Sequence, residues 1–427
     1  MKKNYCISDG IFINNSLNQS FIFFKDDNNN LIFSQANTEG SSTIIDKKVL
    51  SFSATIDDNN RLHLIYLRKR GELIYCIYSE ESWQKKLIGK FDINSNTYKY
   101  LTLFVHKNTI NIIYASANLI NLNLWTIEHI IKVHDNWQKM IVANIFSEKT
   151  VDPFYIDSDE FGNMYLVYSG KEYNNYNIYY LFFNAFTKKW TSNPTKISSS
   201  AVNNILPYLF IDSKKNIHIL WYSSNNGDYL LNYKRYSSVG DTKFQWKEIS
   251  LPQILGDNYP AIMFEKSNML NIIYISQEEI SNLVSNDYGN TWHMDNKTPV
   301  ESYPIYLIRH YSFSSNKPQT KINHCYGNMS NSNISFYFHN IHENLKEISN
   351  NSEDYNSEKS NIGDNSIQHE SEPLPGADAK ELEKLNFAVL EMQNQLKGLK
   401  EDMELIKSKL MDIEEKYNKR GFFSFRW

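Results

Sequence analysis

Hydrophobic and polar positions alternate with a period of two along most of the first 350 residues. Between residues 208 and 249 this alternation predicts four short strands separated by polar turns. We expect these strands at 208–211, 217–222, 229–233 and 246–249. The pattern therefore predicts a fold built from short β-strands.

The predicted strands recur as a repeat. Each repeat has an apolar strand, a polar turn that often contains Asp and Asn, and a second strand that ends in an aromatic residue. The closing aromatics follow one another at intervals of 42 to 54 residues: Phe24, Tyr66, Tyr114, Tyr168, Trp221, Tyr274 and Tyr326. Periods of this length are typical of propellers and other repeat folds. The sequence thus contains seven repeat units.

A tryptophan marks a second position of the repeat, at the start of the fourth strand. Five of the eight tryptophans occupy it: Trp83, Trp137, Trp190, Trp246 and Trp292. Four-stranded units that are apolar on both faces become buried when they pack side by side around an axis. Residues 1–349 are therefore predicted to form an all-β, seven-bladed β-propeller with four strands in each blade.

One turn of the sixth unit carries a complete motif of the form Ser-x-Asp-x-Gly-x-Thr-Trp. Its fixed positions are Ser285, Asp287, Gly289, Thr291 and Trp292. The motif resembles the Asp box of the bacterial neuraminidase repeat, and the chain resembles this sialidase-like superfamily at the level of the fold. The resemblance implies a structural turn between the third and fourth strands, in which Asp and Ser bond the backbone and Trp packs between strands.

The sequence departs from the sialidases in the residues that carry their activity. Those enzymes have an early Phe/Tyr-Arg-Ile-Pro motif and three arginines that hold the substrate carboxylate. This chain lacks the motif and has only five arginines before residue 350. Arg61 is expected in the turn between first and second strands, opposite the family's active site. The resemblance therefore implies architecture and not sialidase activity.

Paired carboxylates are candidate catalytic groups, because glycosidases place two carboxyl groups across the scissile bond. Such pairs are Asp26 with Asp27, Asp57 with Asp58, and Asp157 with Asp159. However, Asp57, Asp157 and Asp212 recur at one place in the repeat, a tight hairpin where Asp bonds its own backbone. We interpret them as turn residues and predict no catalytic residue.

Histidines and cysteines are candidate metal ligands. His63 and His218 occupy one strand position, which in other units is filled by Asn111, Tyr165, Asn271 and Asn323. A layer of polar groups hydrogen-bonded between blades explains this set better than a metal site. The three cysteines are odd in number and widely spaced, so they predict neither a disulfide framework nor a four-cysteine zinc site. We expect no metal and no cofactor.

Charge and hydropathy exclude further classes. The 44 basic and 48 acidic residues are nearly balanced, so they give no nucleic-acid signature. The first residues include two lysines but no apolar stretch typical of a secretory signal, and no apolar run has the length of a transmembrane helix. We expect a protein that is cytoplasmic, or that reaches a surface layer without a Sec signal.

Ligand binding is expected on the loops that enter each first strand and on those that join second to third strands. These loops are rich in Tyr, Asn and Asp, which offer aromatic faces and polar groups suited to sugar hydroxyls. The predicted ligand-binding residues are Tyr176, Asp257, Asn258, Tyr259 and Tyr303. The competing explanation is that Asn is abundant throughout this chain and that loops are polar anyway.

The C-terminal part has a different pattern. Residues 350–377 are rich in Asn, Ser and acidic residues, which predicts a disordered acidic linker. Asp378 and Glu381 then form a capping-box signature, and apolar residues at spacings of three and four cover residues 382–417. This heptad pattern predicts a coiled-coil helix over 378–420 that joins copies of the chain in a homo-oligomer.

Residues 421–427 form an aromatic tail. Phe422, Phe423, Phe425 and Trp427 suit peripheral contact with a membrane or with a partner, and the alternative is that they cap the coiled coil. Together these features predict a non-catalytic, multivalent binding or scaffold protein for a glycan or protein ligand. Two alternatives remain: a carbohydrate-active enzyme, hydrolase or lyase, with a divergent active site, and a structural protein of a surface layer.

Overall fold

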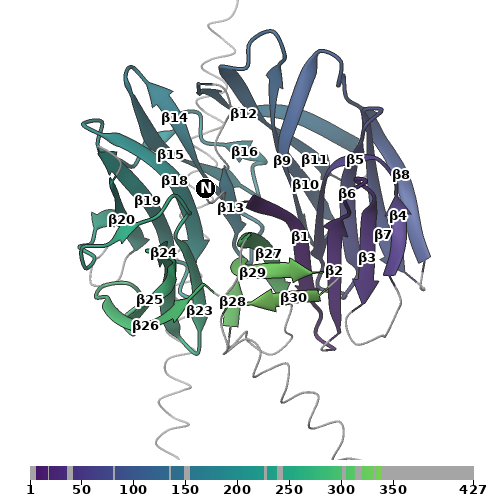
Figure 1. Ribbon diagram of the computed structural model, residues 1–427. Coiled ribbons are helices and arrows are strands. Elements are labelled where there is room, and N and C mark those ends of the chain that lie inside the picture. Colours follow the sequence, from purple (N-terminus) through teal and green to yellow (C-terminus); the bar gives the residue numbers. More distant parts are fainter. Residues whose placement is uncertain are drawn as a thin grey trace, which may run out of the picture. The chain divides into compact units, whose positions relative to one another are not determined.

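The computed structural model describes residues 6–17, 19–35, 42–79, 82–133, 136–148, 154–225, 228–237, 244–300, 304–312, 320–330 and 333–337. These residues are all-β and form the strands β1 to β30 (Figure 1). No helix that could cross a bilayer is found in them. The predicted linker, coiled coil and aromatic tail lie outside the described residues.

Four consecutive stretches of the chain form antiparallel sheets that follow one another in sequence order. Sheet B contains β5 (Val49–Ile56), β6 (Leu62–Arg68), β7 (Glu72–Ser79) and β8 (Ser82–Lys90). Sheet C contains β9 (Asn96–His106), β10 (Thr109–Asn118), β11 (Leu124–Val133) and β12 (Asn136–Phe146). Sheet D contains β13 (Tyr155–Ser158), β14 (Met164–Glu172), β15 (Asn175–Asn184), β16 (Lys189–Trp190) and β17 (Thr195–Lys196). Sheet E contains β18 (Asn203–Ile211), β19 (Ile217–Asn225), β20 (Asp228–Ser237), β21 (Gln245–Glu248) and β22 (Leu255–Gly256).

Two further sheets include strands from the last predicted unit. Sheet F contains β23 (Ile262–Lys266), β24 (Met269–Ser276), β25 (Glu279–Ser285), β26 (His293–Pro299) and β28 (Thr320–Ile322). Sheet A contains β1 (Cys6–Asn14), β2 (Ser20–Lys25), β3 (Leu31–Gln35), β4 (Ser42–Asp46), β27 (Tyr306–Ser312), β29 (His324–Ser330) and β30 (Asn333–Phe336). Six of the seven predicted closing aromatics lie in the second strand of their unit, and Tyr326 lies in β29, after β27 and β28.

The seventh predicted unit does not form a sheet of its own. Its first strand, β27, pairs in parallel with β1, while β28 pairs with β23 of sheet F. The described residues thus form six sheets where the repeat count predicts seven blades. The physical reason is that the ladder edges of β27 and β28 are satisfied by strands of other units, so they need no separate blade.

Side chains of β27 and β28 reach the remaining first strands. Arg309 donates hydrogen bonds to Ser53 Oγ of β5 at 3.2 Å and to the Leu101 carbonyl of β9 at 2.9 Å. Lys321 donates to Asp157 of β13 at 2.9 Å and to the Ile211 carbonyl of β18 at 2.8 Å. With the pairs to β1 and β23, these strands contact the first strand of every sheet. We call β27, β28 and β29 the axial strands, and Figure 1 shows them between the two groups of sheets.

The core consists of apolar layers between neighbouring sheets. Separate clusters lie between A and B, between B and C, and between C and D, and the largest spans D, E, F and the axial strands. In β20 every second residue from Leu231 to Ser237 is buried, as the alternating pattern requires. Burial of apolar area between sheets, at roughly 25 cal/mol per Å², is the main stabilising contribution to this packing.

Candidate functional site

Four of the five predicted ligand-binding residues lie at one end of the sheets, where second and third strands are joined. We call this the loop end. Tyr176 is in β15, and Asp257, Asn258 and Tyr259 lie between β22 and β23. Tyr303 lies outside the described residues.

Tyr176 is held by the segment that precedes it and by the next sheet. Its hydroxyl accepts a hydrogen bond from the Glu148 N–H at 2.9 Å, and its own N–H donates to Asn203 Oδ1 at 3.0 Å. Lys171 forms an ion pair with Glu148 beside it. Tyr176 therefore holds two connecting segments in place, and its side chain is half-buried.

Asn204 organises this part of the loop end, although the sequence pattern did not single it out. Its side chain is 1% exposed and donates to the carbonyls of Ser199 and Val202 at 2.7 and 2.8 Å. Its Oδ1 accepts from Trp221 Nε1 at 3.0 Å and from Ser223 Oγ at 3.1 Å. Its amide nitrogen also donates to the Tyr176 carbonyl at 3.2 Å, and a buried amide with five hydrogen bonds fixes the entry to β18. Its presence in an Asn-rich entry segment was the only available signal.

Asp257 and Asn258 lie in the entry segment to sheet F, and Tyr259 follows them. The Asp257 N–H donates to the Ile275 carbonyl at 2.8 Å, and the Asn258 side chain is exposed. Tyr259 was expected on a loop surface, but its side chain is only 5% exposed and packs against Tyr326 with the rings 6.4 Å apart. The aromatic ring fills the apolar space where the segment enters the core, so Tyr259 is a packing residue.

The structure does not bring Tyr176 and Asp257 together in a single contact. Trp221 and Tyr222 are consecutive in β19, so their side chains point to opposite faces of sheet E. Trp221 faces the Asn204 and Tyr176 side, whereas the Tyr222 hydroxyl lies against Gly256, next to Asp257. Sheet E therefore separates the two halves of the predicted site.

The hairpin between β14 and β15 presents an aromatic ring to solvent. Tyr173 is 92% exposed and has a φ of 56°, in the left-handed region that aromatic residues seldom adopt. Beside it, Glu172 accepts a hydrogen bond from the Tyr179 hydroxyl at 3.1 Å and pairs with Lys196. Asn175 donates to the Ser200 carbonyl at 2.9 Å. The hairpin thus combines a free aromatic face with fixed polar groups.

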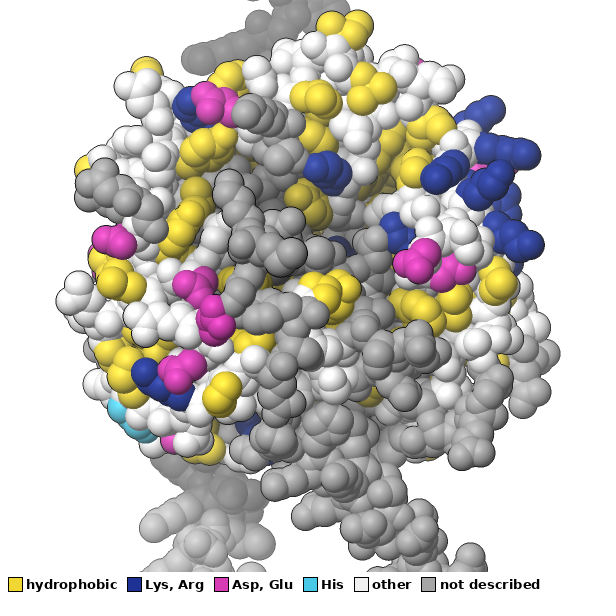
Figure 2. Space-filling view, viewed as in Figure 1, with side chains coloured by type: hydrophobic (Ala, Val, Ile, Leu, Met, Phe, Trp, Pro, Cys, Tyr) yellow, Lys and Arg dark blue, Asp and Glu magenta, His cyan; other side chains and the backbone are white. Residues whose placement is uncertain are grey.

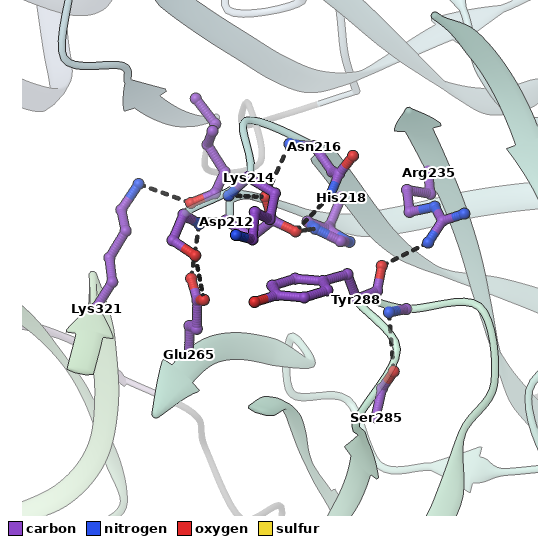
Figure 3. A network of polar contacts seen from close by, with 12 residues as sticks. Asp212, Lys214, Asn216, His218, Arg235, Glu265, Ser285, Tyr288 and Lys321 are labelled. Carbon is purple, nitrogen blue, oxygen red and sulfur yellow. Dashed lines mark hydrogen bonds and ion pairs between the residues drawn. The ribbon is translucent and has the colours of Figure 1, made fainter. Parts of the chain in front are cut away.

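A second polar network lies at the opposite end of the sheets, where first and second strands are joined (Figure 3). We call this the turn end. Asp212 Oδ1 accepts from the N–H groups of Lys214 and Asn216 at 2.9 and 2.8 Å. Glu265, 4% exposed, accepts from the N–H and hydroxyl of Ser213 at 2.7 and 2.5 Å. These buried carboxylates are saturated by donors of the chain itself.

The turn carboxylates continue into a buried trio. Asp212 Oδ2 contacts His218 Nε2 at 3.1 Å, and His218 Nδ1 contacts the Tyr233 hydroxyl at 2.7 Å. In sheet B the same trio recurs as Asp57, His63 and Tyr75, with distances of 3.1 and 2.6 Å. An Asp–His–Tyr chain resembles a catalytic relay, but its recurrence in two units indicates a packing device of the repeat.

The polar layer differs from the prediction in its partners. His63 and His218 bond the turn aspartate and a tyrosine of their own sheet, and not a neighbouring blade. At the equivalent position the Tyr165 hydroxyl donates to Asp159 at 3.0 Å. Pairing within each sheet is favoured because adjacent strands bring these side chains closer than facing sheets do.

The turn aspartate of sheet D is Asp159, two residues later than the predicted Asp157. Asp159 accepts from the N–H groups of Phe161 and Asn163, both at 2.9 Å, as Asp57 and Asp212 do in their hairpins. Asp157 instead lies in β13 and bonds the Ile211 N–H and the Lys321 ammonium, both at 2.9 Å. Asp157 and Asp159 are two residues apart, so the repeat units can be aligned on either aspartate, and only one of them can close the turn.

The Asp-box residues form a closed turn between β25 and β26. Asp287 accepts from the Thr291 N–H and hydroxyl at 2.9 and 2.7 Å, and Ser285 Oγ accepts from the Gly289 N–H at 2.8 Å. Gly289 has a φ of +84°, and a Cβ there would lie 2.2 Å from the Tyr233 hydroxyl. Trp292 is 9% exposed and meets Tyr233 edge-on at 5.5 Å. These contacts hold the turn against sheet E.

Arg235 connects the Asp box to sheet E from inside the core. Its side chain is fully buried, and it donates to the Tyr288 carbonyl (Figure 3) and to Asn290 Oδ1, both at 2.5 Å. The partners are dipoles of the turn and not a carboxylate. The guanidinium thus satisfies acceptors of the box, and its position in the core leaves it out of reach of a substrate.

Metal ligation has no candidate among the described residues, where no three His, Cys, Asp or Glu side chains are grouped suitably for an ion. Cys76 and Cys325 are free and buried. Burial raises the pKa of Cys76 to about 12. Its thiol is therefore protonated and behaves as a small apolar side chain.

No protein-family model matches this sequence, and no curated protein matches it. Several solved structures are similar in fold. An ulvan lyase aligns with 11% identity and a TM-score of 0.48 over 75% of this chain and 88% of its own. The six-bladed β-propeller lectin of Aleuria aurantia aligns with 15% identity and a TM-score of 0.40 over 69% and 97%. An α-L-arabinofuranosidase of Fusarium graminearum aligns with 13% identity and a TM-score of 0.42 over 61% and 84%.

Proposed function

We propose that this protein is a non-catalytic binding protein, a β-propeller of six sheets whose loop end recognises a glycan. The described part is an all-β array of four-stranded meanders, and its first strands all contact the axial strands. Because these strands occupy the place where the first strands converge, we expect the ligand on the rim of the loop end and not on the axis.

The single observation that carries the proposal is the Tyr173 hairpin. Sugar recognition needs an aromatic face for stacking and fixed polar groups for the hydroxyls. Tyr173 offers a ring that is 92% exposed, and hydrogen bonds hold Glu172, Asn175 and Tyr176 next to it. Holding a tyrosine in the left-handed region costs free energy, which supports a role in binding for this residue.

The alternative function is that of a carbohydrate-active enzyme, and the burial of the turn carboxylates argues against it. Asp57, Asp212 and Glu265 are each 4% exposed and accept hydrogen bonds from turn N–H groups or hydroxyls. A hydrolase or lyase requires a carboxylate or other base that faces its substrate. An enzyme of this fold would need its catalytic groups among the exposed residues of the loop end.

The test is a glycan array probed with the intact protein, together with a screen for hydrolysis and elimination on the glycans that bind. We expect binding without turnover. Tyr173→Ala should weaken it by about tenfold, because the stacking face is lost. Phe186→Ala is the matched control, since Phe186 is 94% exposed at the other end of β15. Turnover would establish the enzyme, and equal losses in both variants would refute the Tyr173 site.

Multivalency through residues 382–417 is a further part of the proposal and rests on the heptads alone. Joined propellers would gain roughly 10² to 10⁴ in apparent affinity for a repetitive surface. Light scattering of the intact chain tests this, with Leu396→Pro as the variant that should dissociate the oligomer.

A further inference from the structure

The hairpin between β10 and β11 exposes a cluster of aliphatic side chains at the loop end of sheet C. We call residues 118–124 the aliphatic tip. Ile120 is 96% exposed, and three leucines of the tip are 38% to 47% exposed: Leu119, Leu122 and Leu124. Phe146, opposite Leu124 in the ladder, is 48% exposed. No charged residue occurs between Asn108 and Ile127.

The backbone of the aliphatic tip is already hydrogen-bonded within the protein. Five N–H groups donate to partners of the chain: those of Leu119, Ile120, Asn121, Asn123 and Leu124. Two of the acceptors are the side chains of Asn118 and Asn121, at 2.9 and 3.2 Å. The Leu122 carbonyl accepts from Trp125 Nε1 at 2.8 Å. When such a tip is transferred from water to an apolar phase, these backbone groups keep their hydrogen bonds. This is the condition for inserting backbone into an apolar phase.

Basic residues continue from the tip along the loop end of sheets B and A. The Leu119 N–H bonds the Ser95 carbonyl, the Phe91 N–H bonds the Gly71 carbonyl, and the Lys69 N–H bonds the Lys48 carbonyl. These bonds join the hairpins into one edge, which carries exposed basic side chains: Lys47, Lys48, Lys69, Arg70 and Lys90. Figure 2 shows Lys and Arg side chains gathered on one side of the molecule.

Apart from Asp27, which is exposed in the turn between β2 and β3, the acidic residues of this edge are engaged with the protein. Asp46 and Glu72 both pair with Arg68, at 2.6 and 2.9 Å. The Asp92 carboxylate accepts from the N–H groups of Asn94 and Ser95 at 3.1 and 3.2 Å. The edge therefore presents an uncharged aliphatic tip beside positive charge.

We propose that this edge docks on an anionic lipid surface, with the aliphatic tip inserted at the interface and the basic residues above the headgroups. Peripheral attachment generally needs two such signals, apolar insertion and electrostatic attraction. The self-satisfied backbone favours lipid over a protein groove, because strand addition or loop capture would require unpaired backbone groups. This surface is distinct from the Tyr173 hairpin and goes beyond the proposed function.

The test is co-sedimentation of the intact protein with vesicles of equal parts phosphatidylcholine and phosphatidylserine. We expect binding that falls with salt and is at least tenfold weaker on phosphatidylcholine alone. The double variant Ile120→Asp/Leu122→Asp should bind about tenfold more weakly or worse at unchanged melting temperature, since both side chains are exposed. Lys69→Glu/Arg70→Glu should weaken binding to the anionic vesicles alone.

The matched control is Leu17→Asp, because Leu17 is 69% exposed in the turn between β1 and β2 at the opposite end. Its variant should bind vesicles like the parent protein. Lack of binding by the parent overturns the proposal and leaves the tip as a surface for a protein. Equal binding by the parent and the double Asp variant also overturns it, because attachment would then come from another segment.

Discussion

The two ends of the sheets differ in how they use tyrosine and other large side chains. At the turn end, Asp, His and Tyr are buried and bond the chain itself, as in Asp212, His218 and Tyr233. At the loop end, Tyr173 and Ile120 are more than 90% exposed on tight, internally bonded hairpins. Polar groups at the turn end therefore stabilise the fold, whereas the loop end combines buried polar groups such as Asn204 with exposed side chains that are available for contacts.

This difference shows why a residue's chemistry alone is a poor guide to its role in a repeat fold. The Asp–His–Tyr trio has the composition of an active site and occurs twice inside the core. The exposed aliphatic tip has no reactive group and is the more distinctive surface.

The largest expected effect is loss of stability in mild acid, because buried histidines of the interior are neutral. Burial lowers the pKa of His129 to about 3 and that of His310 to about 4. Trp190 Nε1 donates to His129 Nδ1 at 3.1 Å, which requires the neutral ring. The unfolded histidines have a pKa near 6.5, so the stabilisation is complete above that pH and is lost as the pH falls toward 4. We expect each to contribute about 3 kcal/mol over this range.

Denaturant unfolding at pH 7, 5.5 and 4 measures this loss. His129→Gln should remove the contribution of His129 to the pH dependence of the free energy of unfolding. It should also lower that free energy at pH 7. A free energy of unfolding that is constant between pH 7 and pH 4 would contradict the assignment of neutral buried rings.

The next largest effect concerns the Asp box. Trp292→Ala removes an indole that is 9% exposed and packs on Tyr233, so it should lower the free energy of unfolding by about 3–5 kcal/mol. Glycan and vesicle binding at low temperature should persist, because the box lies away from the loop end. An unchanged melting temperature combined with lost binding would reverse the roles of the two ends.

The position of Trp292 in the repeat is also the feature that the sequence predicted best. A tryptophan repeated at one phase gave the strand order, because a period of two and a turn motif are local properties of the chain. The axial strands were not predictable in this way. β27 has the alternation of a first strand, and only its parallel pairing with β1, about 300 residues away, shows that it belongs to sheet A and not to a sheet of its own.

The candidate site shows the same limit. Loop composition correctly pointed to Tyr176 as part of the loop end, but it gave no indication that Tyr259 turns inward, since burial depends on which sheet faces the segment. Tyr173 belongs to the segment that the sequence singled out, yet its exposure and positive φ appear only in three dimensions. The structural role of Asn204 was not predictable, because the sequence does not distinguish this residue from the many other asparagines.

An intermediate effect should come from the turn aspartates. Asp212→Asn keeps the size of the side chain but replaces an acceptor oxygen with a donor facing His218 and Asn216, at an expected cost of about 1–3 kcal/mol. Asp57→Asn, the matched change in sheet B, should cost less, because its partner Arg61 is 45% exposed.

The pH dependence of these variants supplies the control. Burial raises the pKa of Asp212, but hydrogen bonds from His218 and Asn216 outweigh it, so the pKa lies below its ordinary value. The carboxylate therefore stabilises the fold above about pH 4 and loses this effect as the pH falls through its folded pKa. Parent and Asp212→Asn should converge in stability in acid. A constant difference down to pH 3 would show that the charge is not what matters.

The smallest effect is expected at the loop end and has the opposite sign. Tyr173 has a φ of 56°, where glycine is free of the steric cost that a tyrosine pays. Tyr173→Gly should therefore raise the free energy of unfolding by up to about 1 kcal/mol while it weakens glycan binding, because the stacking ring is gone. Lys188→Gly is the control, since Lys188 has a φ of 57° in the turn that follows β15 at the other end of that strand. It should gain similar stability and keep full binding. If Tyr173→Gly gains stability and also keeps full affinity, the exposed ring contributes nothing to recognition, and the ligand must be held elsewhere on the loop end, such as the segment of Asp257 and Asn258.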